Sequence, residues 1–231
     1  MLGGQHVAVL VLFVLGIPAV VWLGRRVRGT SREQRVNRLL ALAIIAVTVP
    51  LQVLQFTPGE WSLRTSLPFQ LCDLAWMVAV HALWTRSRLS ATIAYLWGIT
   101  LTTQAMITPD LVSPFPEPRF LMFWAMHILI VWAAVYLVPG LRIVPTWRTY
   151  ASTVAATLVW AVSVFTFNVA AGTNYGFLNA KPAKGSVLDL LPAWPWYVAV
   201  QVVVVAAVWA LMVLPWQRAT GAPGGRPVSG S

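Results

Sequence analysis

The sequence predicts an all-α membrane protein, a bundle of seven transmembrane helices that forms one domain over residues 1–218. Three observations support this class. Hydrophobic residues make up 58% of the 231-residue chain and charged residues only 10%, and the mean hydropathy is +0.74, values typical of integral membrane proteins rather than soluble domains. Apolar segments recur along the whole chain. The basic residues stand in short runs between these segments.

Seven apolar segments of about 17 to 22 residues are each long enough to cross a bilayer as a helix. We expect these spans at residues 6–23, 37–56, 67–84, 91–108, 120–138, 149–171 and 194–214. Residues 219–231 are rich in Gly, Pro and Ser, a composition typical of a disordered tail. The chain is therefore predicted to be a multi-pass protein of the cell membrane.

Lys and Arg are distributed unevenly between the loops. The first, third and fifth loops and the C-terminal tail hold twelve of the 16: Arg25, Arg26, Arg28, Arg32, Arg35, Arg38, Arg86, Arg88, Arg142, Arg148, Arg218 and Arg226. The other loops hold Arg64, Arg119, Lys181 and Lys184. Because cytoplasmic loops carry the excess of positive charge, the N-terminus is predicted outside and the C-terminus in the cytoplasm. The basic residues that give the net charge of +10 are then expected to face membrane phospholipids, the expected partners. No nucleic-acid partner is expected.

Polar side chains inside the predicted spans converge on one depth in the outer half of the bilayer. The rise of about 1.5 Å per residue places Cys72 and Asp73 about two turns below the outer end of the third span, and His127 about two turns into the fifth. The other members of this layer are Gln104 and Asn168 in spans, and Asn174, Tyr175 and Asn179 in the loop after the sixth span. Such groups are costly in hydrocarbon and mark functional sites.

Cys72 is the only cysteine, which excludes an intrachain disulfide and a cysteine-rich metal site. A thiol with a reference pKa near 8.5 is mostly protonated at neutral pH and becomes a better nucleophile beside an imidazole. His127 lies at the depth of Cys72, whereas His81 lies about 13 Å deeper on the same helix as the cysteine, so His127 is the candidate base. Two alternatives remain: Cys72 as a small buried hydrophobe and His127 as an interhelical hydrogen-bonding group.

Asp73 and Trp76 share a stripe of the third span with Cys72. Asp73 either orients His127, as the acid does in a catalytic triad, or pairs structurally inside the bundle. The side chains predicted to line a substrate pocket are Gln70, Gln104, Asn168, Asn174, Tyr175 and Trp76, and interhelical hydrogen bonding is the alternative role for the amides. No metal and no cofactor is expected, because one Cys and three His at different depths are a weak ligand set.

Five segments together carry the pattern of one family. They are LPFQLCDLA at 67–75, YLWGITLTTQAMITPDL at 95–111, MHILI at 126–130, NYGFLNAKP at 174–182 and AWPWYV at 193–198. The chain resembles the bacterial YwaF-like integral membrane proteins, the group that includes vertebrate transmembrane protein 164. The resemblance implies a compact multi-helix bundle. For the vertebrate branch it implies a phospholipid acyltransferase with a cysteine nucleophile and a histidine partner, which would be Cys72 and His127 here.

The leading functional hypothesis is a membrane lipid acyltransferase or transacylase that works in the outer leaflet, with Cys72 as nucleophile and His127 as base. A second hypothesis is a non-catalytic seven-helix protein that binds or transports a small or lipidic ligand. A third is a structural partner of other envelope proteins. Thiol reactivity separates the first hypothesis from the other two.

Overall fold

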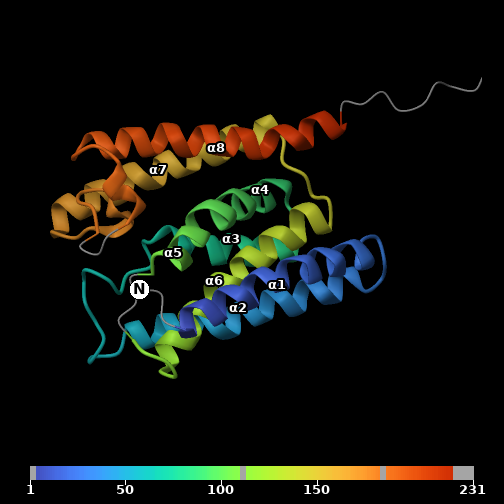
Figure 1. Ribbon diagram of the computed structural model, residues 1–231, viewed down its shortest axis with the longest axis horizontal. Coiled ribbons are helices and arrows are strands. Elements are labelled where there is room, and N and C mark those ends of the chain that lie inside the picture. Colours follow the sequence, from blue (N-terminus) through green and yellow to red (C-terminus); the bar gives the residue numbers. More distant parts are fainter. Residues whose placement is uncertain (1–3, 110–112, 183–185, 221–231) are drawn as a thin grey trace, which may run out of the picture.

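The computed structural model describes residues 4–109, 113–182 and 186–220, and all regular secondary structure in these residues is helical, with no strand among them (Figure 1). The predicted tail from residue 221 on, together with Asp110 and Lys184, lies outside the described residues. The elements in chain order are α1 (Gly4–Val27), α2 (Glu33–Gln55), α3 (Leu71–Thr85), α4 (Arg88–Trp97), the π-helix η1 (Gly98–Thr102), α5 (Thr103–Ile107), α6 (Pro118–Val135), the π-helix η2 (Tyr136–Gly140), α7 (Trp147–Ala171), the short 3₁₀ helices η3 (Tyr175–Phe177) and η4 (Val187–Leu190), and α8 (Trp196–Thr220).

Five helical segments are long and apolar enough to cross a membrane: α1, α2, α6 with η2, α7 and α8. The prediction of an all-helical membrane protein is thereby confirmed. The predicted spans 67–84 and 91–108 correspond to the shorter α3 and to α4, η1 and α5 in succession. The seven-span count and the orientation of the termini stay predictions.

The centre of the bundle is α6. In the apolar stretch of α6 and η2 that is long enough to cross a membrane, 67% of the residues are buried, against 11–28% for the other four long helices. It contacts α1, α2, α3 and α4, while α3 packs between α2 and α4. In Figure 1, α7 and α8 run side by side along one edge, and α7 joins the rest through α4. The side chains of α6 therefore meet more partners than those of any other helix.

Local chemistry sets the two ends of α3. Gln70 is the N-cap, in an extended conformation, and it forms a capping box with Asp73, so the helix starts at Leu71 rather than at the predicted residue 67. The helix ends where Arg86 adopts the left-handed conformation with φ +58°, a common way to stop a helix. This shorter helix places Cys72 in its first turn.

Two glycines allow α1 to approach η2 closely. A Cβ atom added to Gly24 would lie 2.8 Å from the Cα atom of Gly140, closer than atoms can pack. The two backbones are in contact because neither residue carries a side chain, as in small-residue interfaces of membrane helices.

Candidate functional site

Cys72 is a free, half-buried cysteine in the first turn of α3. The sequence-based depth of about two turns below the helix start is wrong, because the helix begins at Leu71. Its side chain packs against a buried cluster that includes Ala75 of α3, Leu96 of α4, and Met126 and Ile130 of α6. The thiol thus faces the interior of the bundle, next to the helix that carries His127.

His127 lies in the middle of α6 with 1% of its surface exposed. Its Nδ1 atom is 2.7 Å from the carbonyl oxygen of Phe123, and its ring lies 4.2 Å from the Phe123 ring. Since a carbonyl oxygen only accepts hydrogen bonds, this contact requires the proton on Nδ1. The Nε2 atom then carries the lone pair, and it is buried without a hydrogen-bond partner. A buried, unpartnered basic nitrogen is the most informative group in the bundle.

The structure brings Cys72 and His127 to neighbouring helices, because α3 packs directly against α6. Cys72 contacts the cluster formed in part by Met126 and Ile130, which flank His127 on α6. The thiol and the Nε2 atom do not hydrogen-bond each other in this structure. The dyad therefore stays a prediction, with its two members on adjoining elements.

Asp73 closes the first turn of its own helix. Its Oδ2 atom accepts a hydrogen bond from the backbone nitrogen of Gln70 at 3.1 Å, completing the capping box, and a carboxylate at a helix N-terminus is also favoured by the helix dipole. It does not orient His127, since the Phe123 carbonyl holds Nδ1 and Nε2 has no partner. In this structure Asp73 caps its own helix, and the oxygen that hydrogen-bonds His127 is the Phe123 carbonyl.

Gln70 ties the start of α3 to a distant loop. Its Oε1 atom accepts a hydrogen bond from the backbone nitrogen of Gly176 at 2.9 Å, and its side chain also caps the backbone nitrogen of Asp73. The predicted pocket-lining amide therefore joins α3 to the segment after α7.

Asn168 organises that segment through four hydrogen bonds. Its amide nitrogen donates to the Tyr175 carbonyl at 2.9 Å and to the Asn179 side chain at 2.8 Å. Its oxygen accepts from the Thr173 hydroxyl at 2.7 Å and from the Tyr175 backbone nitrogen at 2.9 Å. All of its hydrogen-bonding capacity is used within the loop. Asn168 is a structural residue of the loop.

Asn174 and Tyr175 complete the same loop. Asn174 binds the backbone of Asn179 and Ala180. The buried Tyr175 hydroxyl donates to the Leu63 carbonyl at 2.8 Å and accepts from the Leu67 nitrogen at 3.0 Å, and burial raises the pKa of Tyr175 above its usual range. These contacts fix the loop against the α2–α3 connection.

Gln104 and Trp76 differ from those loop residues. Gln104 donates only within its own segment, to the Thr108 hydroxyl at 2.9 Å. The indole Nε1 atom of Trp76 is buried without a partner. Of the side chains predicted to line a pocket, Trp76 alone presents a buried unpartnered polar atom among the described residues.

Two further buried polar atoms without a hydrogen-bond partner were missed by sequence reasoning. They are the Thr102 hydroxyl of η1, a residue with 1% exposure, and the Trp124 Nε1 atom of α6. With Trp76 and His127, they belong to α3, η1 and α6, three elements that pack against one another. We call this set the α3–η1–α6 junction. Irregular π-helical turns of this kind frequently occur at functional sites.

The register across η1 and α6 places Thr102 near the depth of His127. A Cβ atom added to Gly98 would lie 3.2 Å from the Ala134 Cβ atom and 3.7 Å from the Ile130 side chain. Because η1 and α6 run in opposite directions, Thr102, one turn after Gly98, lies opposite the turn of α6 before Ile130. No sequence signal marks Thr102, since threonine in an apolar helix usually bonds its own backbone.

Among the residues that the structure describes, no three His, Cys, Asp or Glu side chains gather where they could hold a metal ion.

A family model described as the TMEM164 family matches residues 1–213. The chain belongs to the TMEM164 family. This match confirms the resemblance found from the motifs, and the TMEM164-family region includes Cys72, His127 and the α3–η1–α6 junction. No curated protein and no solved structure matches the chain.

Proposed function

We propose that this TMEM164-family protein is a membrane lipid acyltransferase or transacylase with Cys72 as nucleophile and His127 as general base. One observation carries the proposal: the buried His127 has an unpartnered Nε2 atom on the helix that packs against α3, where the only free thiol lies. The Phe123 carbonyl holds the imidazole in the tautomer that a base requires. The proposal includes seven spans in the cell membrane, with the N-terminus outside.

In the first half of the reaction, Nε2 takes the proton of Cys72, and the thiolate attacks the ester carbonyl carbon of a membrane phospholipid. The tetrahedral intermediate collapses with cleavage of the carbon–oxygen bond. The leaving lysolipid oxygen takes the proton from Nε2. The products are a thioester on Cys72 and a lysolipid.

In the second half, Nε2 takes the proton of an acceptor hydroxyl, whose oxygen attacks the thioester carbonyl. The thiolate leaves and regains the proton from the imidazolium. The unpartnered Thr102 hydroxyl and Trp76 indole nitrogen are donors available to a negatively charged intermediate oxygen, a role that is worth most in a dry site. The hydrogen bond between thiol and imidazole then forms in the substrate complex, as catalytic contacts often do.

The test is acyl-thioester formation on the purified protein in phospholipid nanodiscs, measured by mass spectrometry of the intact chain. We expect the wild type to gain one hydroxylamine-sensitive acyl group, Cys72→Ala to gain none, and His127→Ala to gain it at least ~100-fold more slowly, the contribution typical of a general base. His81→Ala is the matched control, because His81 is exposed and bonds Ser90 at 2.8 Å. Wild-type acyl transfer by Cys72→Ala would overturn the role of Cys72, and a wild type that gains no acyl group would favour a non-catalytic lipid-binding protein.

A further inference from the structure

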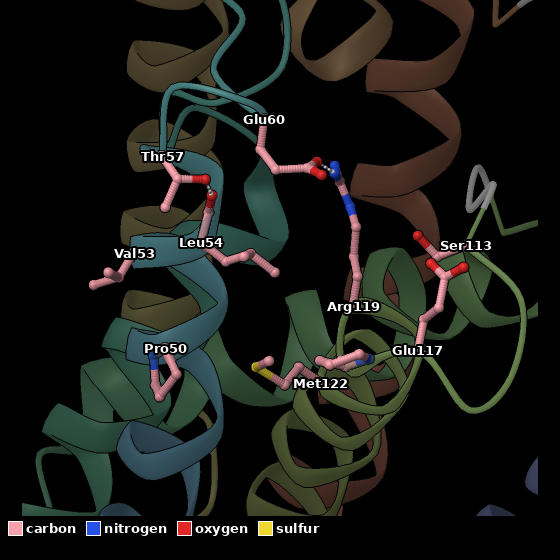
Figure 2. A pocket seen from close by; sticks show the side chains of 10 residues that line it. Pro50, Val53, Leu54, Thr57, Glu60, Ser113, Glu117, Arg119 and Met122 are labelled. Carbon is pink, nitrogen blue, oxygen red and sulfur yellow. Dashed lines mark hydrogen bonds and ion pairs between the residues drawn. The ribbon is translucent and has the colours of Figure 1, made fainter.

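An open cavity of about 470 Å³ lies between the end of α2 and the start of α6 (Figure 2). Its apolar side is formed by Pro50, Val53 and Leu54 of α2 and by Met122 of α6. Its charged side chains are Glu60 in the α2–α3 connection, and Glu117 and Arg119 at the start of α6. We call this cavity the α2–α6 slot. Its volume lies within the range of about 300–1,000 Å³ that is typical of small-ligand sites.

The slot is at the end of the bundle away from the arginine-rich turns. α2 runs from the turn that holds Arg28 and Arg32 to the slot, and α6 begins at the slot. Its apolar side belongs to helix ends and its charged side to residues just beyond the apolar stretch of α2. A lipid in the bilayer has the same arrangement, with its hydrocarbon tail at the level of the apolar side and its polar headgroup at the level of the charged side.

An ion pair lies across the charged side of the slot. The Nη1 atom of Arg119 is 2.5 Å from the Oε2 atom of Glu60, with 34% and 44% of their side chains exposed. Such partly exposed pairs contribute little to stability, so a ligand with matching charges can replace the contact at little cost. In Figure 2 the two side chains reach toward each other above Met122.

The charges favour one class of headgroup. A guanidinium binds a phosphate through two parallel hydrogen bonds, and Arg119 is the cation among the residues that line the slot. The two carboxylates, Glu60 and Glu117, outnumber it. They suit an ammonium group and repel a headgroup that carries only negative charge.

We infer that the α2–α6 slot binds one zwitterionic phospholipid, with its phosphate on Arg119 and its ammonium group between Glu60 and Glu117. The first part of an acyl chain lies against Pro50, Val53, Leu54 and Met122. This binding does not require acyl transfer. Met122 also packs against the buried cluster that Cys72 packs against; use of the slot as a substrate site rests on the proposed function.

The experiment is native mass spectrometry of the full chain in detergent with an equimolar mixture of phosphatidylcholine and phosphatidylglycerol. We expect phosphatidylcholine to be retained preferentially, and Arg119→Gln to weaken its binding about tenfold, the loss expected for a charged hydrogen-bonding partner. Arg64→Gln is the matched control, since Arg64 is an exposed arginine of the α2–α3 connection that does not line the slot. Glu60→Gln combined with Glu117→Gln should shift the preference toward phosphatidylglycerol.

A second pair of variants tests the apolar side without altering charge. Val53→Trp should fill the slot and abolish retention, whereas Val49→Trp, an exposed site on the same helix outside the slot, should not. Cys72→Ser should retain phosphatidylcholine like the wild type, so that loss of catalysis and loss of binding are separated. Equal retention of both lipids, wild-type binding by Arg119→Gln or Val53→Trp, or equally tight binding of soluble phosphocholine would overturn the inference.

Discussion

Two sets of buried polar side chains in this bundle differ in their hydrogen bonding. In the loop after α7, the Asn168 amide makes four hydrogen bonds and uses every donor and acceptor it has. In the α3–η1–α6 junction, His127, Thr102, Trp76 and Trp124 each bury an atom that has no partner. Of these residues, Asn168 and His127 were expected at one depth in the same site, whereas Thr102 and Trp124 were not predicted. The first set is fully hydrogen-bonded within the loop, whereas the second retains free donors and acceptors that the proposed reaction would use.

The largest effect on stability is expected from Asn168→Leu. The substitution leaves the Thr173 hydroxyl and both backbone groups of Tyr175 without their partner, and each buried unsatisfied group costs about 1–3 kcal/mol. We expect the free energy of unfolding to fall by roughly 3 kcal/mol, measured by denaturant or thermal unfolding in detergent. Ser163→Leu on the exposed face of α7 is the control and should change it little. Equal stability of the two variants would remove the distinction between the two sets.

An intermediate effect is expected from Gln70→Met, which keeps the length of the side chain and removes its oxygen. Gly176 loses its acceptor and α3 loses half of its capping box. A lost cap costs about 0.5–2 kcal/mol, so the free energy of unfolding, measured by thermal unfolding, should decrease by this amount. Gln104→Met is the matched control, because Gln104 bonds only Thr108 in its own segment. A control that falls as far as Gln70→Met would contradict the role of Gln70 as the link between α3 and the loop.

The smallest effect, and one of opposite sign, is expected from Thr102→Val. The change keeps the shape of the side chain and removes a buried hydroxyl without a partner, so the free energy of unfolding should rise by up to about 1 kcal/mol. The same variant should slow acyl transfer if the hydroxyl serves the reaction. Thr153→Val is the comparison, since the buried Thr153 hydroxyl bonds the Thr149 carbonyl at 2.8 Å and should gain no stability. A loss of stability in Thr102→Val would show that the hydroxyl has a hydrogen-bond partner when the protein is in the membrane.

Much of the fold was predictable because the apolar segments are long and the loops are polar. The windows 37–56 and 149–171 agree with α2 and α7 to within a few residues. The start of α3 was not found, although the spacing of Gln70 and Asp73 is that of a capping box, because the hydrophobic segment continues upstream into Leu67 and Phe69. The π-helical turn η1 packs against α6, and no local sequence signal marks its start at Gly98.

The sequence located buried polar residues but not their hydrogen-bond partners. His127 was identified because it is an ionisable residue in an apolar helix, and the structure shows it buried with a free nitrogen. The roles of Asp73 and Asn168 depend on which backbone groups remain unpaired in the folded chain, which no residue type reveals. Counting residues along a helix gives the depth of a side chain but not the face on which it lies. Thr102, on the face of η1 next to α6, was therefore not predicted.

The position of Cys72 in the first turn of α3 has a consequence for how a lipid would reach it. Ester linkages of glycerophospholipids lie at the boundary between headgroups and hydrocarbon, and a thiol in the first turn of a membrane helix would lie near that same level. In the proposed reaction the substrate would then remain in its leaflet, with its tails still among other lipids, while only the ester moves sideways toward the protein. Acyl transfer at this height would avoid the cost of moving an acyl chain into water.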